Sequence, residues 1–270
     1  MQLLPLVRSL EVDRRKGLSH KRLEERTGPS KKPWQGRCRK GVSVVNTDRR
    51  TATIVGVLYI IGTIAGILSV VVTGGFSMDA PAYLDKAASD PSQIQLGAFL
   101  VLVMGLALAM VAAMMFPILK RQNEALAVGY VIFRGALEAS AYMATAICFL
   151  LLVVVAGQHA DSGAAVASQS SSRGVLLVDA QDQIAAVLAI VFSLGALMLY
   201  YLLYQGRLIP RWISGWGIVA AVLTLAGGLI DIFGTARDIL AMPMLPQEMV
   251  MAVWLIAKGF SPSTIASGTR

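Results

Sequence analysis

The chain has 270 residues, of which 56% are hydrophobic and only 15% are charged, with a formal net charge of +8. A soluble domain is typically about half apolar and a quarter charged, so this composition excludes an ordinary soluble protein. The apolar residues fall in long uncharged runs, and a helix needs about 20 residues to cross roughly 30 Å of hydrocarbon. Four runs exceed that length, at 51–78, 91–119, 139–160 and 183–206. The sequence therefore predicts a polytopic membrane protein.

The positive charge is concentrated in residues 1–44, which hold 12 of the 24 lysines and arginines and leave the rest of the chain balanced. Charge confined to one tail argues against nucleic-acid binding. Its composition predicts disorder, with a helical turn near Leu18–Glu25. Two interpretations remain open. The tail binds anionic lipid headgroups, or it precedes the native start and the chain begins at Val45, because bacterial genes often start at a valine codon.

The cysteines and histidines do not indicate a disulfide, a metal site or a cofactor. Cys38 lies in the tail and Cys148 inside a predicted span, and His20 and His159 both fall outside the spans. Their spacing matches no metal-binding pattern. We therefore expect no cofactor.

Hydrophobic run lengths predict an all-α fold, a transmembrane helix bundle with six spans. In chain order, the spans lie near 52–74, 94–117, 130–155, 183–204, 213–232 and 240–259, within a membrane domain of residues 45–260 that is followed by a short tail, 261–270. The sixth is interrupted by Pro243, Pro246 and Glu248. With the N-terminus inside, eight lysines and arginines beyond the tail fall in inner segments and three in outer ones, so the positive-inside rule places both termini in the cytoplasm.

The connections support this threading. In 78–93, Asp79 and Asp90 each precede a proline closely, which predicts a short surface helix and then the start of the second span. The outer segment 157–174 is small and polar and predicts a flexible loop. Aromatic residues flank the inner link 205–211 and predict a belt at headgroup depth: Tyr200, Tyr201, Tyr204, Trp212 and Trp216. Small-residue faces such as Gly62-x-x-x-Gly66 and Gly105-x-x-x-Ala109 predict close packing within the bundle.

Four segments together resemble a known family: TDRRTATIVGVLYIIGTIAG (47–66), FRGALE (133–138), YLLYQGRLIPRWISGWGIV (201–219) and QEMVMAVWLIAKGF (247–260). In this order and spacing they are similar to a bacterial integral-membrane family catalogued as domain-of-unknown-function family 4386. The resemblance runs from about Val45 to Phe260. It implies a compact six-helix protein of the bacterial cytoplasmic membrane and no particular activity. It also marks five charged positions for testing: Arg134, Glu138, Arg211, Glu248 and Lys258.

The third span contains two charges, and an ionisable residue within a span costs roughly 2.5–3.5 kcal/mol at the helix centre. Arg134 and Glu138 are four residues apart and project from one helix face. Tyr130, Tyr142 and Thr145 extend that face into a polar stripe. Two interpretations remain open: the pair forms an interior polar site, or Arg134 reaches the inner headgroups with Glu138 as its neutralising partner one turn deeper.

Glu248 also has two interpretations. A helix from Pro246 to Phe260 is about 22 Å long, too short to span alone, and a broken helix that begins inside the membrane is a common way to build a transporter site. In that reading Glu248 is the third helical residue, near the positive helix end. The alternative is a helix that starts at the outer interface. Asp231 is expected at the outer interface and Lys258 at the inner one.

Catalytic motifs are not found: no histidine lies in a span for a Ser–His pair, and neither H-E-x-x-H nor a P-loop is present. Enzymatic activity is therefore not expected. Two function classes remain. The protein binds or passes a small molecule or ion at a polar site between spans three and six, formed by Arg134, Glu138 and Glu248. Alternatively, it is a non-catalytic component that assembles through its spans with a membrane protein or a second copy of itself.

Overall fold

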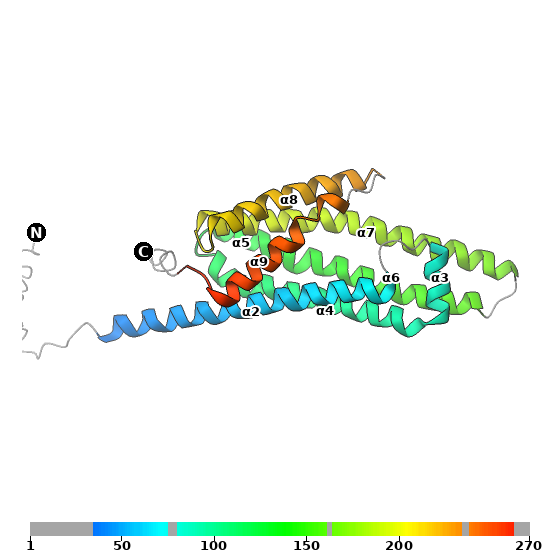
Figure 1. The fold of residues 1–270 in the computed structure, drawn as a ribbon, viewed down its shortest axis with the longest axis horizontal. Helices are drawn as coiled ribbons and strands as arrows, with labels where there is room; N and C mark the ends of the chain where they lie inside the picture. Colours follow the sequence, from blue (N-terminus) through cyan, green and yellow to red (C-terminus); the bar gives the residue numbers. More distant parts are fainter. Residues whose placement is uncertain (1–34, 75–79, 161–163, 234–237, 262–270) are drawn as a thin grey trace, which may run out of the picture. The chain divides into compact units, whose positions relative to one another are not determined.

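A computed structural model describes residues 35–74, 80–160, 164–233 and 238–261, and these ranges are helical apart from short turns and links (Figure 1). The described chain is thus all-α, as predicted. In order, its elements are α2 (Gln35–Thr73), α3 (Ala80–Ser89), α4 (Pro91–Leu119), α5 (Glu124–Tyr130), η1 (Val131–Leu137), α6 (Glu138–Ala160), α7 (Ala164–Gln205), α8 (Arg211–Asp231), η2 (Asp238–Leu240) and α9 (Met244–Ala257). Residues 45–270 form one unit, separate from residues 1–44.

Five stretches of helix in the described chain are long and apolar enough to cross a membrane. They are Asp48–Thr73, Pro91–Leu119, Glu124–Gln158, Ser170–Gln205 and Arg211–Asp231. The sixth predicted span corresponds to α9, which has 14 residues and is therefore only about 21 Å long. Figure 1 shows α4, α6, α7 and α8 side by side, with α9 (red) crossing obliquely between α8 and α2.

The second span begins where its capping residues predict. α4 starts at Pro91, and the Asp90 side chain accepts a hydrogen bond from the backbone N–H of Gln93. The Ser92 hydroxyl also donates to Asp90, at 2.6 Å. These donors stabilise the ionised carboxylate, with Ser92 the largest cause, and hold the pKa of Asp90 below its usual value. The predicted surface helix before it is α3, whereas Asp79 lies outside the described residues.

The prediction of a flexible loop at 157–174 is wrong for its described residues. α6 continues to Ala160 and α7 begins at Ala164. The reason is tertiary: α3 packs against both helices, where its Leu84 and Ala87 are buried with Phe149 and Leu152. A Cβ at Gly174 would lie only 2.3 Å from Leu84, so the small residue allows this contact.

Both tails fall mainly outside the description. Residues 1–34, including the predicted turn at 18–25, and residues 262–270 are not described. Residues 35–44, for which the sequence predicts disorder, are the first turns of α2.

Small residues let neighbouring helices approach closely, as predicted. A Cβ at Gly62 would meet Leu108 at 3.3 Å, and one at Gly66 would meet the Met104 sulfur at 2.6 Å, so α2 lies against α4. A Cβ at Gly105 would meet Tyr142 at 3.0 Å, so α4 also lies against α6. These faces are used within the chain.

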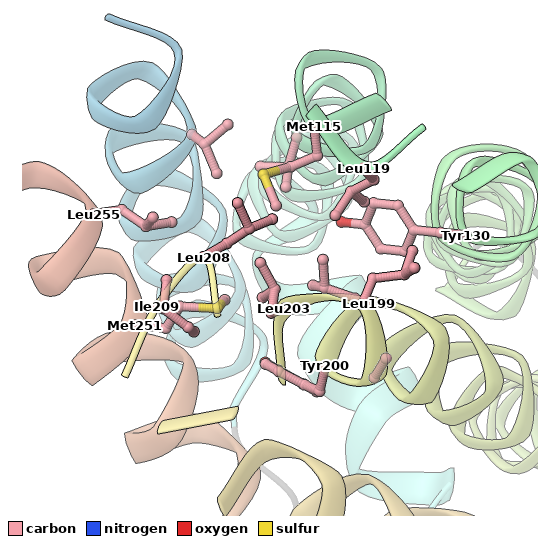
Figure 2. Close-up of a cluster of buried hydrophobic side chains, with 14 of the residues drawn as sticks. Met115, Leu119, Tyr130, Leu199, Tyr200, Leu203, Leu208, Ile209, Met251 and Leu255 are labelled. Atoms are coloured by element: carbon pink, nitrogen blue, oxygen red, sulfur yellow. The ribbon is translucent and has the colours of Figure 1, made fainter. Parts of the chain in front are cut away.

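The main core lies toward the end of the bundle that carries the links α4–α5 and α7–α8. Figure 2 shows side chains from several elements meeting there, and the labelled ones are Met115, Leu119, Tyr130, Leu199, Tyr200, Leu203, Leu208, Ile209, Met251 and Leu255. The predicted aromatic belt is wrong for Tyr200, which is fully buried, whereas Tyr201, Tyr204 and Trp212 are exposed. Tyr200 lies on the opposite side of α7 because its hydroxyl finds a polar partner inside the bundle.

Polar contacts tie this same end together. Arg121 pairs with Asp48 at 2.9 Å. Arg49 donates to the carbonyl of Ala257 at 3.0 Å, which satisfies a terminal carbonyl of α9. The Ser261 N–H donates to the Leu208 carbonyl at 2.9 Å. These contacts join the start of the first span, the α4–α5 and α7–α8 links, and the end of α9. We call this end of the bundle the basic end.

Candidate functional site

The third span changes its helical geometry around Arg134. η1 is a π-helical segment that separates α5 from α6, with Arg134 at its centre and Glu138 as the first residue of α6. π-Helical turns are rare and frequently occur at functional sites. The backbone of α7 approaches this segment closely, since a Cβ at Gly195 would lie 3.3 Å from the Arg134 nitrogen.

Arg134 lies between two carboxylates. Its Nη2 donates to Oε1 of Glu248 at 2.8 Å, which joins the third span to α9. Its Nη1 lies 3.3 Å from Oε2 of Glu138, close enough for an ion pair but not aligned as a hydrogen bond. The side chains of Arg134, Glu138 and Glu248 are 2%, 0% and 14% exposed, respectively. We call these three residues the charge triad.

Aromatic rings surround the guanidinium. Its carbon lies 4.5 Å from the centre of the Phe192 ring and 5.7 Å from that of Tyr59. Cations favour the faces of aromatic rings at such distances. Tyr130 is fully buried and interacts electrostatically with Arg134, and Tyr142 adjoins Glu138. The rings therefore contribute to the burial of the guanidinium.

Several polar atoms of this cluster have no hydrogen-bond partner although they are buried. Among the described residues they are both oxygens of Glu138, Nε and Nη1 of Arg134, and the hydroxyls of Tyr59 and Tyr130. The large majority of buried polar side-chain atoms in proteins are hydrogen-bonded, so each exception calls for an explanation. Here all the exceptions fall on residues of one cluster.

A second polar contact lies beside the triad. The Tyr200 hydroxyl donates to Oε1 of Gln247 at 2.7 Å, and Nε2 of Gln247 donates to the Ile213 carbonyl at 3.2 Å. This links α7, α9 and α8. The Tyr200 ring lies against Gly217, where a Cβ would come within 2.5 Å of it.

The cluster lies at a similar distance from the basic end on each helix. Tyr59 follows Asp48 by eleven residues, Arg134 follows Glu124 by ten, and Glu248 precedes Ala257 by nine. At 1.5 Å per residue these separations are roughly 13–17 Å.

The structure thus brings together three of the predicted residues, Arg134, Glu138 and Glu248, with Tyr130 and Tyr142 beside them. It places the remaining two elsewhere: Asp231 ends α8, half-buried, and Lys258 is exposed at the end of α9. One expectation is wrong. α9 begins at Met244, so Glu248 is its fifth residue and not the third, and it lies beyond the first turn.

Sequence reasoning missed Tyr59, Phe192, Tyr200 and Gln247 as members of the site. Each is an isolated residue in an apolar stretch, and only Gln247, next to Glu248, carries a polar signal that marks it. Among the described residues, no three His, Cys, Asp or Glu side chains are grouped so that they could hold a metal ion.

Comparison with known proteins gives the family. No curated protein and no solved structure matches the chain significantly. Residues 54–259 match the model of a family described as a domain of unknown function, DUF4386. This match covers most of the chain. It includes the charge triad and most of each of the five long apolar helices. The chain belongs to the domain-of-unknown-function family 4386.

Proposed function

We propose that this protein crosses the bacterial cytoplasmic membrane six times with both termini inside, and that it binds or passes a small molecule or ion at the charge triad. The case for a sixth span rests on α9, whose Glu248 pairs with a buried arginine of the third span. A helix of about 21 Å spans most of a roughly 30 Å core, and the turns before it supply further length.

The orientation is supported by the basic end. Arg49, Arg121, Arg207, Arg211 and Lys258 all lie in segments that its contacts join. Lysines and arginines favour the cytoplasmic side. With this end at the inner surface, the triad lies about 15 Å deep, near the middle of the hydrocarbon. Transporters commonly bind substrates at that depth.

One observation carries the binding role: the six buried polar atoms without partners, all in or beside the triad. Ionisable groups in a membrane are costly, and where they occur they generally mark ion or substrate pathways. A purely structural pair would satisfy its donors and acceptors within the protein. The small-residue faces, which partner assembly would use, are occupied by contacts within the chain, so the geometry favours binding over assembly.

Topology is tested with alkaline phosphatase fusions, which are active only outside the cytoplasm. A fusion after Arg270 should be inactive, and one within 161–173 should be active. The opposite pattern would contradict the orientation, and activity at both sites would contradict the sixth span.

Binding is tested by thermal unfolding of the purified protein with four kinds of probe: sodium or potassium chloride, choline chloride, small primary amines, and protons supplied by lowering the pH. A ligand at 100 times its Kd stabilises by about 2.7 kcal/mol. We expect at least one probe to stabilise the wild type and the control Glu124→Gln, whose residue is exposed at the start of the same span, but neither Glu138→Gln nor Glu248→Gln. Equal responses in all four proteins would favour the assembly role.

A further inference from the structure

The charge triad is not balanced. It contains one cation, Arg134, and two carboxylates, so its formal charge is −1 when all three groups are ionised. An unmatched charge is strongly unfavourable away from water, and two carboxylates that share a site do not readily ionise together. The triad therefore requires one further positive charge.

The residues around the triad that the structure describes do not supply that charge. The titratable groups that interact electrostatically with the two carboxylates come from four other positions: Tyr59 on α2, Tyr130 on α5, Tyr142 on α6 and Tyr200 on α7. Tyrosine is neutral near neutral pH. Among the ion pairs of the described residues, both carboxylates pair with Arg134 and with no other cation.

The two carboxylates have different environments. Glu248 accepts the 2.8 Å hydrogen bond from Arg134 and is 14% exposed. Glu138 is 0% exposed and neither of its oxygens accepts an aligned hydrogen bond. Burial favours the neutral form of a carboxyl group, and the guanidinium beside Glu138 is shared with Glu248.

We propose, building on the binding role above, that the cation held by this site is a proton and that Glu138 carries it. A proton adds to a lone pair of one Glu138 oxygen, which forms an O–H bond and changes the charge of the triad from −1 to zero without breaking any bond. A proton occupies no volume beyond the carboxyl itself, which suits an oxygen that is already enclosed.

Proton binding is thereby linked to the position of α9. Arg134 neutralises Glu248 while Glu138 is protonated, and it neutralises Glu138 if Glu248 withdraws. Release of the proton and undocking of Glu248 therefore favour each other, since coupling between two such events is reciprocal. The triad thus provides a means by which a proton biases the position of a helix.

Infrared spectroscopy tests this directly, because a protonated carboxyl has its own carbonyl stretching band. The wild type near neutral pH should show one such buried band, and it should shift in D₂O because the proton exchanges with water. Glu124→Gln, the exposed control, should retain it. Glu138→Gln should lose it, and so should Glu248→Gln, because Glu138 then ionises as the sole partner of Arg134.

The residue that carries the proton is identified with Glu138→Asp and Glu248→Asp, which keep a carboxyl group but alter its carbonyl stretching frequency. The band should move in the first variant and stay in the second. Retention of the band in both glutamine variants, a shift in Glu248→Asp alone, or no shift in D₂O would overturn the proposal. Loss of the band in sodium or potassium chloride but not in choline chloride would also overturn it, since the occupant is then an alkali ion, while the binding role itself would stand.

Discussion

The pairing of Arg134 with Glu248 holds α9 against the third span, and replacing the two residues singly and together measures its strength. Arg134→Met leaves two carboxylates without a cation. Removing one partner of a buried pair typically costs about 3–5 kcal/mol, and the Arg134 side chain is only 2% exposed. We therefore expect a loss of stability in that range.

The other substitutions should cost less, because the triad has a spare carboxylate. Glu248→Leu leaves Arg134 with Glu138 at 3.3 Å, so we expect a loss of about 1.5–3 kcal/mol, the usual contribution of a hydrogen bond to a charged group. Glu138→Gln keeps the 2.8 Å bond between Arg134 and Glu248. Although this side chain is fully buried, the loss should stay below about 1 kcal/mol, within the range of a neutral hydrogen bond.

In the double variant Arg134→Met with Glu248→Leu, the shared bond is lost only once. The double loss should therefore be smaller than the sum of the single losses by about 0.5–3 kcal/mol, the range for residues in contact. The measurement is thermal unfolding of the detergent-solubilised protein by circular dichroism, in which each kcal/mol shifts Tm by roughly 2–4 °C. Glu124→Gln is the control. Additive losses would show that the two side chains do not meet, and a larger loss for Glu138→Gln than for Glu248→Leu would show that Glu138 is the main partner of Arg134.

Two further predictions concern stability away from the triad. Gly217→Ala should destabilise the protein by about 1–3 kcal/mol, because its added methyl group overpacks against Tyr200. The control is Gly215→Ala, whose methyl group meets nothing within 4 Å and should not destabilise the protein. Equal Tm values for the two variants would contradict this packing. The lowered pKa of Asp90 means that its ionised form stabilises the fold at neutral pH, and that this contribution is lost as pH falls below the ordinary value of 3.8. The Tm difference between wild type and Asp90→Ala should therefore shrink on acidification, and a constant difference would refute the role of the ionised cap.

Local signals in the sequence were sufficient for the class of protein and for most of the helices. Hydropathy over about 20 residues predicts five apolar helices that the structure contains, because in lipid every backbone polar group must be satisfied within its own helix. Asp90 followed by Pro91 predicts the start of α4 for a similarly local reason, since a cap acts on the next three residues. The four-residue spacing of Arg134 and Glu138 also places them on one face without knowledge of any neighbour.

Contacts between helices override the local sequence preference at two places. Residues 164–174 look like a loop, yet they are helical, and α3 packs against this helix at Gly174. Tyr200 looks like an interfacial residue, yet it is buried because Gln247 accepts a hydrogen bond from its hydroxyl. Neither partner is close in sequence, so a local pattern cannot reveal it.

The same distinction applies to the site. The sequence by itself determined that charged groups lie in the third span and at Glu248, because their cost in lipid makes them conspicuous. Only the tertiary structure decided that Arg134 binds Glu248, 114 residues away, and that Tyr59 and Phe192 surround the guanidinium. Lipid and a neighbouring helix are equally apolar to a helix face, so hydropathy contains no information about which faces meet. The choice of partner for each buried charge is therefore made by the packing of the bundle.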